Sequence, residues 1–430
     1  MQSIRRQALS LTAANGFTRA LGFLMRILLA RLMPPEALGV MEMAHSVEML
    51  ALTPVTAGTP AAMSRLTAQH PADERKAVLQ TGLLATAKLS LVLIAITLPL
   101  SPLISYLIGD GRTLPSLLVH TPCIMLLGLA SVYQGWCFGM QQMRLPAFAE
   151  CMEQLIRITL SVLLLIAFRH ADFGIIAAVP GAAEAIAAAC VLAVFMTKHP
   201  PDRSIAPERS LVRELRSLAA PAVASRLCTT GLRAFNAVLI PSCLRISGLS
   251  VSAATAQYGL LTGMAMPALM LPGIITGAIS TAAAPSVTAR DAKQDGLDSL
   301  VRNLRRTAFL IGLVSAACLI AVSDVIATVL FRTPEAAPLI RLMSPTALIM
   351  SIQQVQYGAI AGLGLQRRQL TGSIVGELLS TLLIAYFTPM PQMRLYGAAV
   401  AMISGQLITL IWGCCVLNRA ISNSKYAQQV

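Results

Sequence analysis

Two pairs of arginines lie inside long apolar stretches of this 430-residue chain. Arg19 and Arg26 are seven residues apart in the first stretch, and Arg226 and Arg233 repeat that spacing in the second half. Residues seven apart in an α-helix differ by about 20° around the axis and by about 10 Å along it, so each pair forms a stripe on one face. A guanidinium stays charged and donates two parallel hydrogen bonds, which suits phosphate. We therefore predict that these four arginines bind an anionic substrate group.

Acidic side chains and a histidine recur in the same apolar stretches. Glu42, His45 and Glu48 follow at spacings of three residues, so they share a broad helix face. Such a stripe can carry protons or bind sodium, but its carboxylates can equally be partners of the arginines. Glu153 precedes Arg157 by four residues, where we expect an ion pair. Six residues are thus candidates for ion coupling or for lining a cavity: Glu42, His45, Glu48, Lys88, Glu153 and Arg157.

The composition indicates that these residues belong to membrane helices. Hydrophobic residues make up 56% of the chain and charged residues 12%, against about 25% charged in soluble domains. This excludes a water-soluble enzyme and a disordered chain. Twelve apolar windows are long enough to span a bilayer as α-helices. They cover residues 9–31, 38–63, 78–108, 116–141, 147–168, 174–197, 217–241, 253–280, 305–331, 337–363, 370–389 and 395–418.

The basic residues predict the orientation in the membrane. The net charge is +14, but lysine and arginine lie between the apolar runs, which favours a membrane surface over nucleic acid as the partner. With the N-terminus inside, the cytoplasmic segments carry 20 of these cations and the opposite loops carry seven. The bias predicts a multi-pass protein of the cell membrane with both termini in the cytoplasm. Six cations remain at membrane depth: Arg19, Arg26, Lys88, Arg157, Arg226 and Arg233.

Matching residues at constant offsets indicate an internal duplication. The Gly-x3-Gly segment at 135–139, a pattern that permits close helix packing, recurs at 358–362, and the arginine pair recurs 207 residues after its first occurrence. Six windows in each half give both halves the same topology, related by an axis along the membrane normal. We predict an all-α fold with an N-terminal lobe at 1–200, a cytoplasmic linker at 201–216 and a C-terminal lobe at 217–430.

Motifs of enzymes, metal sites and cofactor sites are absent from the sequence. It contains no HExxH, GxSxG, P-loop or glycine-rich dinucleotide turn. The five histidines are scattered, mostly in expected loops, and the nine cysteines form no CxxC pair. We therefore predict no enzymatic activity, no catalytic residue, no metal site and no cofactor.

Several segments resemble a known family. Helices 1 and 2 contain the segments Thr18-Arg19-Ala-Leu-Gly22-Phe23-Leu-Met-Arg26 and Thr56-Ala-Gly58-Thr-Pro60-Ala-Ala-Met-Ser64-Arg65, and later helices contain Gln134-Gly135, Glu153-Gln154-Leu155-Ile156-Arg157 and Ser225-Arg226. These segments are similar to the stage V sporulation protein B and polysaccharide-exporter branch of the multidrug/oligosaccharidyl-lipid/polysaccharide (MOP) exporter superfamily.

The resemblance implies two six-helix, MATE-like lobes around a central cavity that opens alternately to either side. The related lipid II flippases move undecaprenyl-pyrophosphate-linked sugars and use cavity arginines for the pyrophosphate. Arg19 and Arg26 fall on the family's arginine positions in helix 1. Two features depart from the pattern: His45 and Glu48 lie near the place of an arginine in the lipid II flippases, and twelve windows fit where sporulation-type members have fourteen helices.

We therefore expect a flippase that moves a polyprenyl-pyrophosphate-linked saccharide, a cell-wall or polysaccharide precursor, to the outer leaflet by alternating access. Its partners would be that lipid-linked saccharide, the lipid bilayer, and a coupling cation or the membrane potential, without nucleic acid. One alternative is a cation-coupled multidrug exporter of the same superfamily, in which Glu42, Glu48 and Glu153 would be central. Another is a non-transporting membrane scaffold for envelope or spore assembly, which would need no cavity.

Overall fold

The chain folds into long α-helices. The computed structural model describes the backbone of residues 2–202, 208–293 and 296–427, and their side chains apart from those of 2–15, 19, 291–293 and 423–427. These residues form α-helices with short 3-10 and π segments, and no strand occurs in the ranges described. Two compact units divide the chain, unit 1 at Met1–Val238 and unit 2 at Leu239–Val430. The prediction of an all-α polytopic membrane protein is confirmed.

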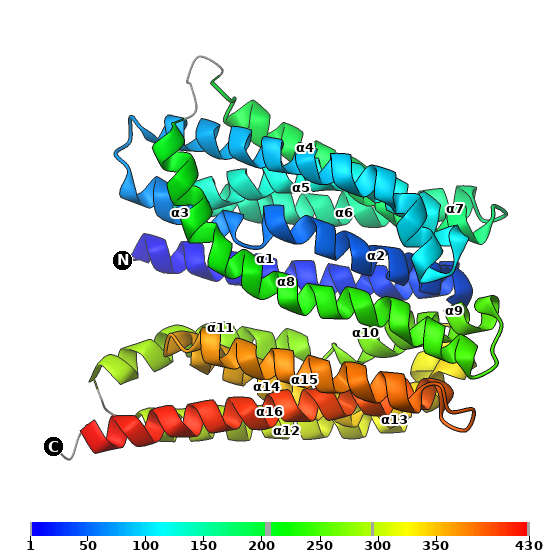
Figure 1. The fold of residues 1–430 in the computed structure, drawn as a ribbon. Helices are drawn as coiled ribbons and strands as arrows, with labels where there is room; N and C mark the ends of the chain where they lie inside the picture. Colours follow the sequence, from blue (N-terminus) through cyan, green and yellow to red (C-terminus); the bar gives the residue numbers. More distant parts are fainter. Residues whose placement is uncertain (1, 203–207, 294–295, 428–430) are drawn as a thin grey trace. The chain divides into compact units, whose positions relative to one another are not determined.

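Unit 1 contains the helices from the N-terminus to most of α8, drawn in blue to green in Figure 1. Their bounds are α1 Gln2–Leu32, α2 Pro35–Thr56, α3 Thr59–Gln69, α4 Arg75–Ile108, the 3-10 turn η1 Gly111–Thr113, α5 Leu114–Gly139, α6 Arg144–Ala167, α7 Phe173–Lys198 and α8 Arg209–Ile246. Helix α5 packs against α2, α3, α4 and α7, which makes it the central helix of the unit.

Unit 2 begins within α8 and continues to the C-terminus. Its further elements are α9 Val251–Gly259, the π segment η2 Leu260–Ala265, α10 Met266–Leu269, α11 Gly273–Lys293, α12 Leu297–Val325, the π segment η3 Ile326–Leu330, the 3-10 turn η4 Pro334–Ala336, α13 Ala337–Met343, α14 Pro345–Gly362, α15 Gln366–Phe387 and α16 Arg394–Ala427. Helix α14 packs against α11, α12 and α16.

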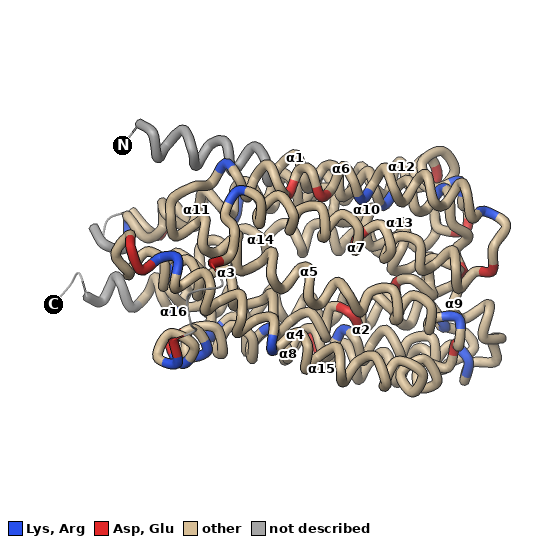
Figure 2. The backbone as a smooth tube through the Cα atoms, turned by 90° about the horizontal axis from the view of Figure 1, so that it is seen from above, with Lys and Arg blue, Asp and Glu red and all other residues tan. Residues whose placement is uncertain are grey.

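Eleven of the twelve apolar windows fall on one helix or on two consecutive elements, and the window 253–280 covers α9, η2, α10 and the first part of α11. By length and composition, seven described helices are able to cross a membrane, and an eighth span is obtained by joining 251–269 to 273–290 across a 56° bend. Helices α1, α2 and α6 are outside this group, and each carries several charged residues. Figure 2 shows that charged residues gather towards the helix ends, whereas the long middle stretches are mostly uncharged.

Glycines set the close packing inside each unit. A Cβ atom at Gly139 of α5 would lie 2.6 Å from the Ser64 carbonyl oxygen of α3, and one at Gly362 of α14 would lie 2.5 Å from the Ala284 carbonyl oxygen of α11. Side chains at these positions would overlap the neighbouring backbone, so the predicted close approach at the Gly-x3-Gly segments is confirmed. The same contact recurs in both units, between the helix that carries the glycines and the second half of a broken helix.

The predicted linker at 201–216 is partly helical. Residues 203–207 lie outside the described part, and α8 begins at Arg209. Leu211 and Leu215 are buried in the core of unit 1, together with Tyr133 and Phe195, whose rings stack at 5.4 Å. The first turns of α8 therefore pack as an amphipathic helix against unit 1.

Candidate functional site

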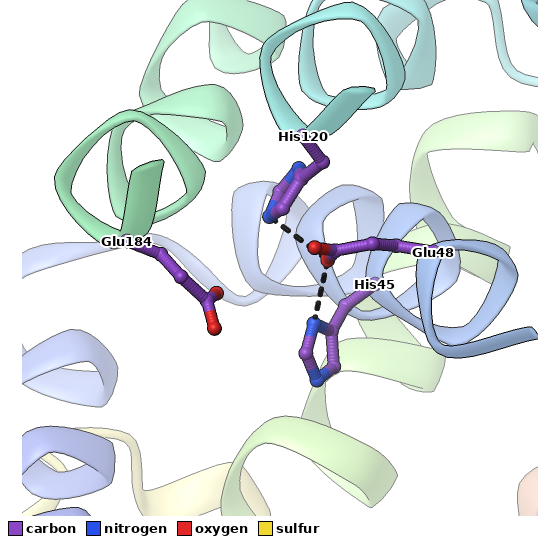
Figure 3. A group of neighbouring side chains, drawn as sticks. All are labelled: His45, Glu48, His120 and Glu184. Atoms are coloured by element: carbon purple, nitrogen blue, oxygen red, sulfur yellow. Dashed lines mark hydrogen bonds and ion pairs between the residues drawn. The ribbon is translucent and has the colours of Figure 1, made fainter. Parts of the chain in front are cut away.

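Three helices of unit 1 bring four ionisable side chains together. His45 and Glu48 come from α2, His120 from α5 and Glu184 from α7 (Figure 3). One ligand-type atom from each residue lies within 4.8 Å of those of the other three. We call these four residues the His–Glu cluster. Three of its members, Glu48, His120 and Glu184, are buried in the middle stretches of their helices.

Glu48 is the centre of the His–Glu cluster. His45 precedes it by three residues on α2, which places both side chains on one face, and His45 Nδ1 lies 3.1 Å from Glu48 Oε2. His120 Nε2 approaches the same oxygen to 3.2 Å. The other carboxylate oxygen, Oε1, is buried and has no hydrogen-bond partner among the described residues. A buried carboxylate oxygen without a hydrogen-bond partner is energetically unfavourable unless a proton or another cation balances the charge.

The orientation of His120 is fixed by its surroundings. Its Nδ1 lies 2.6 Å from the Ser116 carbonyl oxygen one turn earlier, so Nδ1–H donates and Nε2 points to Glu48. Gly181 on α7 leaves room for the imidazole ring, because a Cβ atom there would lie 2.5 Å from Nε2. A histidine whose Nδ1–H is held by a backbone carbonyl presents a free Nε2 lone pair when neutral, which is the usual arrangement of a metal ligand.

Arg157 of α6 is tied to the His–Glu cluster through Glu184. Its Nη1 lies 3.3 Å from Glu184 Oε1, and its Nη2 donates to Gln154 Oε1 at 2.8 Å. The sequence predicted an ion pair with Glu153 on the same helix, and that expectation is wrong in its partner. Glu153 still interacts electrostatically with both Arg157 and Glu184. The guanidinium therefore links α6 to α7 across the interior.

Arg26 of α1 forms an ion pair with Glu42 of α2. The Arg26 side chain is 34% exposed, whereas Glu42 is buried. The Arg26 side chain is thus paired with an acid and only partly exposed. This contact agrees with the interpretation of Glu42 as an arginine partner. The Arg19 side chain lies outside the described residues, so its predicted role stays a prediction.

Arg226 and Arg233 lie near the middle of α8 and both are exposed. Neither guanidinium has an ion pair with a described residue of the chain. Between them, Thr230 is buried and its hydroxyl meets that of Thr53 on α2 at 3.2 Å, which holds this part of α8 beside α2. The two arginines therefore flank a fixed contact and remain available for an anionic group.

Lys88 lies away from the His–Glu cluster. It is exposed on α4 and lines a pocket of about 400 Å³ with Arg209 and Arg216 from the start of α8. Apolar side chains of Leu84, Ala85 and Val212 complete the pocket. Lys88 is thus part of a basic surface pocket, and the structure does not bring it together with Glu48 or Arg157.

Two members of the His–Glu cluster were not predicted from the sequence. The five histidines were interpreted as mostly loop residues, whereas His120 lies within α5 and is 4% exposed. Glu184 was not assigned to any site. The available signal was their position, since each is an isolated ionisable residue inside an apolar window, at 116–141 and at 174–197. Such residues are costly at membrane depth and mark functional sites.

Taken together, the helices and the interior ionisable groups define an all-α polytopic membrane protein with ionisable side chains buried inside unit 1. An inward-facing multidrug resistance MATE family transporter of the MOP superfamily has a similar structure, with a TM-score of 0.76 and 15% identity over 95% of this chain and 96% of that chain. The lipid II flippase MurJ, in an inward closed conformation, also gives a TM-score of 0.76, with 13% identity over 97% and 90% of the two chains. At these identities the likeness establishes the fold alone.

Sequence comparison narrows this class to a family. Residues 4–290 match the model of a family described as polysaccharide biosynthesis protein. Stage V sporulation protein B of Bacillus subtilis (strain 168) is 30% identical over 436 residues, which cover 96% of this chain and 84% of that protein. The chain therefore belongs to the polysaccharide biosynthesis protein family, and the resemblance drawn from its arginine and glycine motifs is confirmed.

Proposed function

We propose that this protein is a flippase that moves a polyprenyl-pyrophosphate-linked saccharide from the cytoplasmic to the outer leaflet. Membership of the polysaccharide biosynthesis protein family and the fold shared with the lipid II flippase MurJ support this class of substrate. In the same proposal, lobes at 1–200 and 217–430 rock about the linker at 201–216, and both termini lie in the cytoplasm.

The observation that carries the proposal is the state of Arg226 and Arg233. Each central arginine costs roughly 2.5–3.5 kcal/mol on the membrane-insertion scale. Arg26 and Arg157 offset that cost with the acids Glu42 and Glu184, but no described carboxylate pairs with the two arginines of α8. An anionic substrate would offset it during transport, and a pyrophosphate offers phosphate oxygens to two arginines whose Cα atoms are about 10 Å apart along one face of the helix.

The arginines of α1 have a different part in this proposal. Arg26 already has one carboxylate partner in Glu42, so a phosphate oxygen would share or replace that partner. Arg226 and Arg233 would then make the first contacts with the pyrophosphate, and Arg26 and Arg19 would accept it as the cavity changes its access.

The alternative, a cation-coupled multidrug exporter, is favoured by one observation. The His–Glu cluster places a buried carboxylate between two imidazoles in unit 1. In an exporter this cluster would be essential and the α8 arginines would be replaceable, whereas a flippase requires the arginines. The two functions therefore predict opposite effects of substitutions in the His–Glu cluster and at the α8 arginines.

Reconstitution into vesicles tests the proposal. The protein is incorporated with a fluorescent polyprenyl-pyrophosphate-linked saccharide, and its movement is followed by chemical quenching from outside. We expect protein-dependent translocation that falls at least about tenfold in Arg226→Gln and Arg233→Gln, a loss of about 1.4 kcal/mol or more of substrate interaction. Arg213→Gln is the matched control, since Arg213 is an exposed arginine of the same helix. Absence of translocation by the wild type for several lipid-linked saccharides would refute the proposal.

A further inference from the structure

We infer that the His–Glu cluster of unit 1, His45, Glu48, His120 and Glu184, is a binding site for a divalent transition-metal ion of the zinc class. The sequence predicted no metal site, because the ligands come from three helices and follow no metal-binding motif in the chain. The inference goes beyond the flippase proposal and is independent of it, since none of these residues is among the arginines assigned to the substrate.

The residue types of the His–Glu cluster suit a transition metal. Two imidazoles and two carboxylates form the set. Imidazole suits zinc, nickel, copper and iron, whereas magnesium and calcium prefer oxygen ligands alone. Zinc sites made of histidine and acidic ligands are commonly four-coordinate and tetrahedral. The residue types therefore select a transition metal over the hard cations.

The distances between the ligand atoms also fit a metal site. In a tetrahedral site with bonds of about 2.0–2.1 Å, neighbouring ligand atoms are about 3.3 Å apart. Glu48 Oε2 lies 3.1 Å from His45 Nδ1 and 3.2 Å from His120 Nε2. Charge-assisted hydrogen bonds between nitrogen and a carboxylate are shorter, about 2.7–2.9 Å. Glu48 Oε2 is thus already separated from one atom of each histidine by the distance expected between neighbouring metal ligands.

The surroundings of His120 and Glu48 leave both side chains able to bind a metal. The Ser116 carbonyl holds the Nδ1–H of His120, which leaves Nε2 for a ligand. Glu48 is 5% exposed, and its Oε1 has no hydrogen-bond partner among the described residues. A metal bound by Glu48 would satisfy this carboxylate. Figure 3 shows the Glu184 carboxylate extending from α7 into the space beside the other three.

The charged groups around the cluster also favour a cation. The described groups that interact here include the arginines Arg26 and Arg157 and the acids Glu42, Glu48, Glu150, Glu153 and Glu184. The carboxyl groups outnumber the guanidinium groups in the interior of unit 1, and buried charge of one sign is unfavourable without a counter-ion. Protons or one divalent cation can balance these carboxyl groups, and titration with zinc distinguishes the two.

Glu184 and Arg157 complete the picture of the site. The ligand atoms span up to 4.8 Å, and Glu184 Oε1 is held by Arg157 at 3.3 Å. Metal binding requires Glu184 to approach Glu48 while one of its oxygens keeps the contact with the guanidinium. Arg157 is therefore a positioning residue for the fourth ligand.

The test uses full-length protein without a histidine tag, purified in detergent and treated with a chelator. Calorimetric titration with ZnCl₂ is expected to give one site per chain, and Co²⁺ is expected to give the intense visible absorption of a tetrahedral site. Glu48→Gln should weaken zinc binding at least about 100-fold, since loss of a direct ligand exceeds the 10–100-fold effect typical of outer partners. His170→Ala, a surface histidine variant, should leave binding unchanged.

Folding is controlled separately from binding. Glu48→Gln preserves the shape of the side chain and removes a buried charge, so the apo variant should unfold at or above the temperature of the apo wild type. Zinc should raise the unfolding temperature of the wild type and of His170→Ala but not of Glu48→Gln. No stoichiometric zinc binding by the wild type, or equal binding by Glu48→Gln and the wild type, would overturn the inference. In that case protons alone would balance the cluster.

Discussion

Replacing Gly181 by alanine probes the geometry around His120. A methyl group at this position of α7 would lie 2.5 Å from Nε2 and 2.7 Å from Nδ1 of the His120 ring. The ring cannot simply recede, because Nδ1 is held by the Ser116 carbonyl at 2.6 Å. We expect the ring to rotate away, which breaks that hydrogen bond and separates Nε2 from Glu48.

The magnitude follows from three effects. A buried polar group that loses its partner costs about 1–3 kcal/mol, and overpacking an interior costs about 1–3 kcal/mol. Alanine in place of glycine within a helix returns about 1 kcal/mol. The free energy of unfolding should therefore fall by roughly 1–5 kcal/mol, the net of these ranges, in Gly181→Ala.

Equilibrium unfolding in mixed detergent micelles measures this change. Gly22→Ala is the matched control, because a Cβ atom at Gly22 of α1 would meet nothing within 4 Å. That variant should be as stable as the wild type or more stable. Equal stability of Gly181→Ala and Gly22→Ala would show that His120 does not occupy the position described here.

Three further predictions concern the packing and charge of unit 1. Arg157→Gln should lower the free energy of unfolding by about 3–5 kcal/mol, because it leaves Glu184 without its cation; the double change with Glu184→Gln should restore most of it. Gly139→Leu should lower the unfolding temperature by forcing α5 from α3, whereas a surface leucine substitution should not. Burial lowers the pKa of His199, just beyond α7, so the folded state takes up its proton less readily than the unfolded chain; stability should fall as the pH drops below about 6.5, and less steeply in His199→Gln.

The sequence was sufficient to predict the helices. A continuous apolar window forms an α-helix in a bilayer, because the helix satisfies every backbone hydrogen bond within its own segment. The glycines at 139 and 362 also predicted close contacts between helices, because a residue without a side chain allows the backbone of a neighbouring helix to approach. The breaks within helices were not predicted. The bend of 56° between 251–269 and 273–290 lies inside a single predicted window.

The site was predictable only where its residues share a helix. His45 and Glu48 were grouped correctly by their spacing of three residues on α2. His120 joins them from 72 residues further along the chain, and this contact depends on how α2 packs against α5. The same reason explains Arg157, whose nearest acid along the helix is Glu153 but whose ion pair is with Glu184 of α7. The spacing of residues along one helix does not show whether an arginine pairs with an acid of the same helix or with an acid of a helix packed against it.

Translocation of matched substrates tests the central claim most directly. Two fluorescent polyprenyl saccharides, one joined through pyrophosphate and one through an uncharged linker, are compared in vesicles containing the wild type, Arg226→Gln/Arg233→Gln or Arg213→Gln. The account predicts that the wild type and Arg213→Gln move the pyrophosphate-linked saccharide much faster than the uncharged one, and that the double variant loses this preference. A double variant that moves the pyrophosphate-linked saccharide at the wild-type rate would contradict the role assigned to these two arginines.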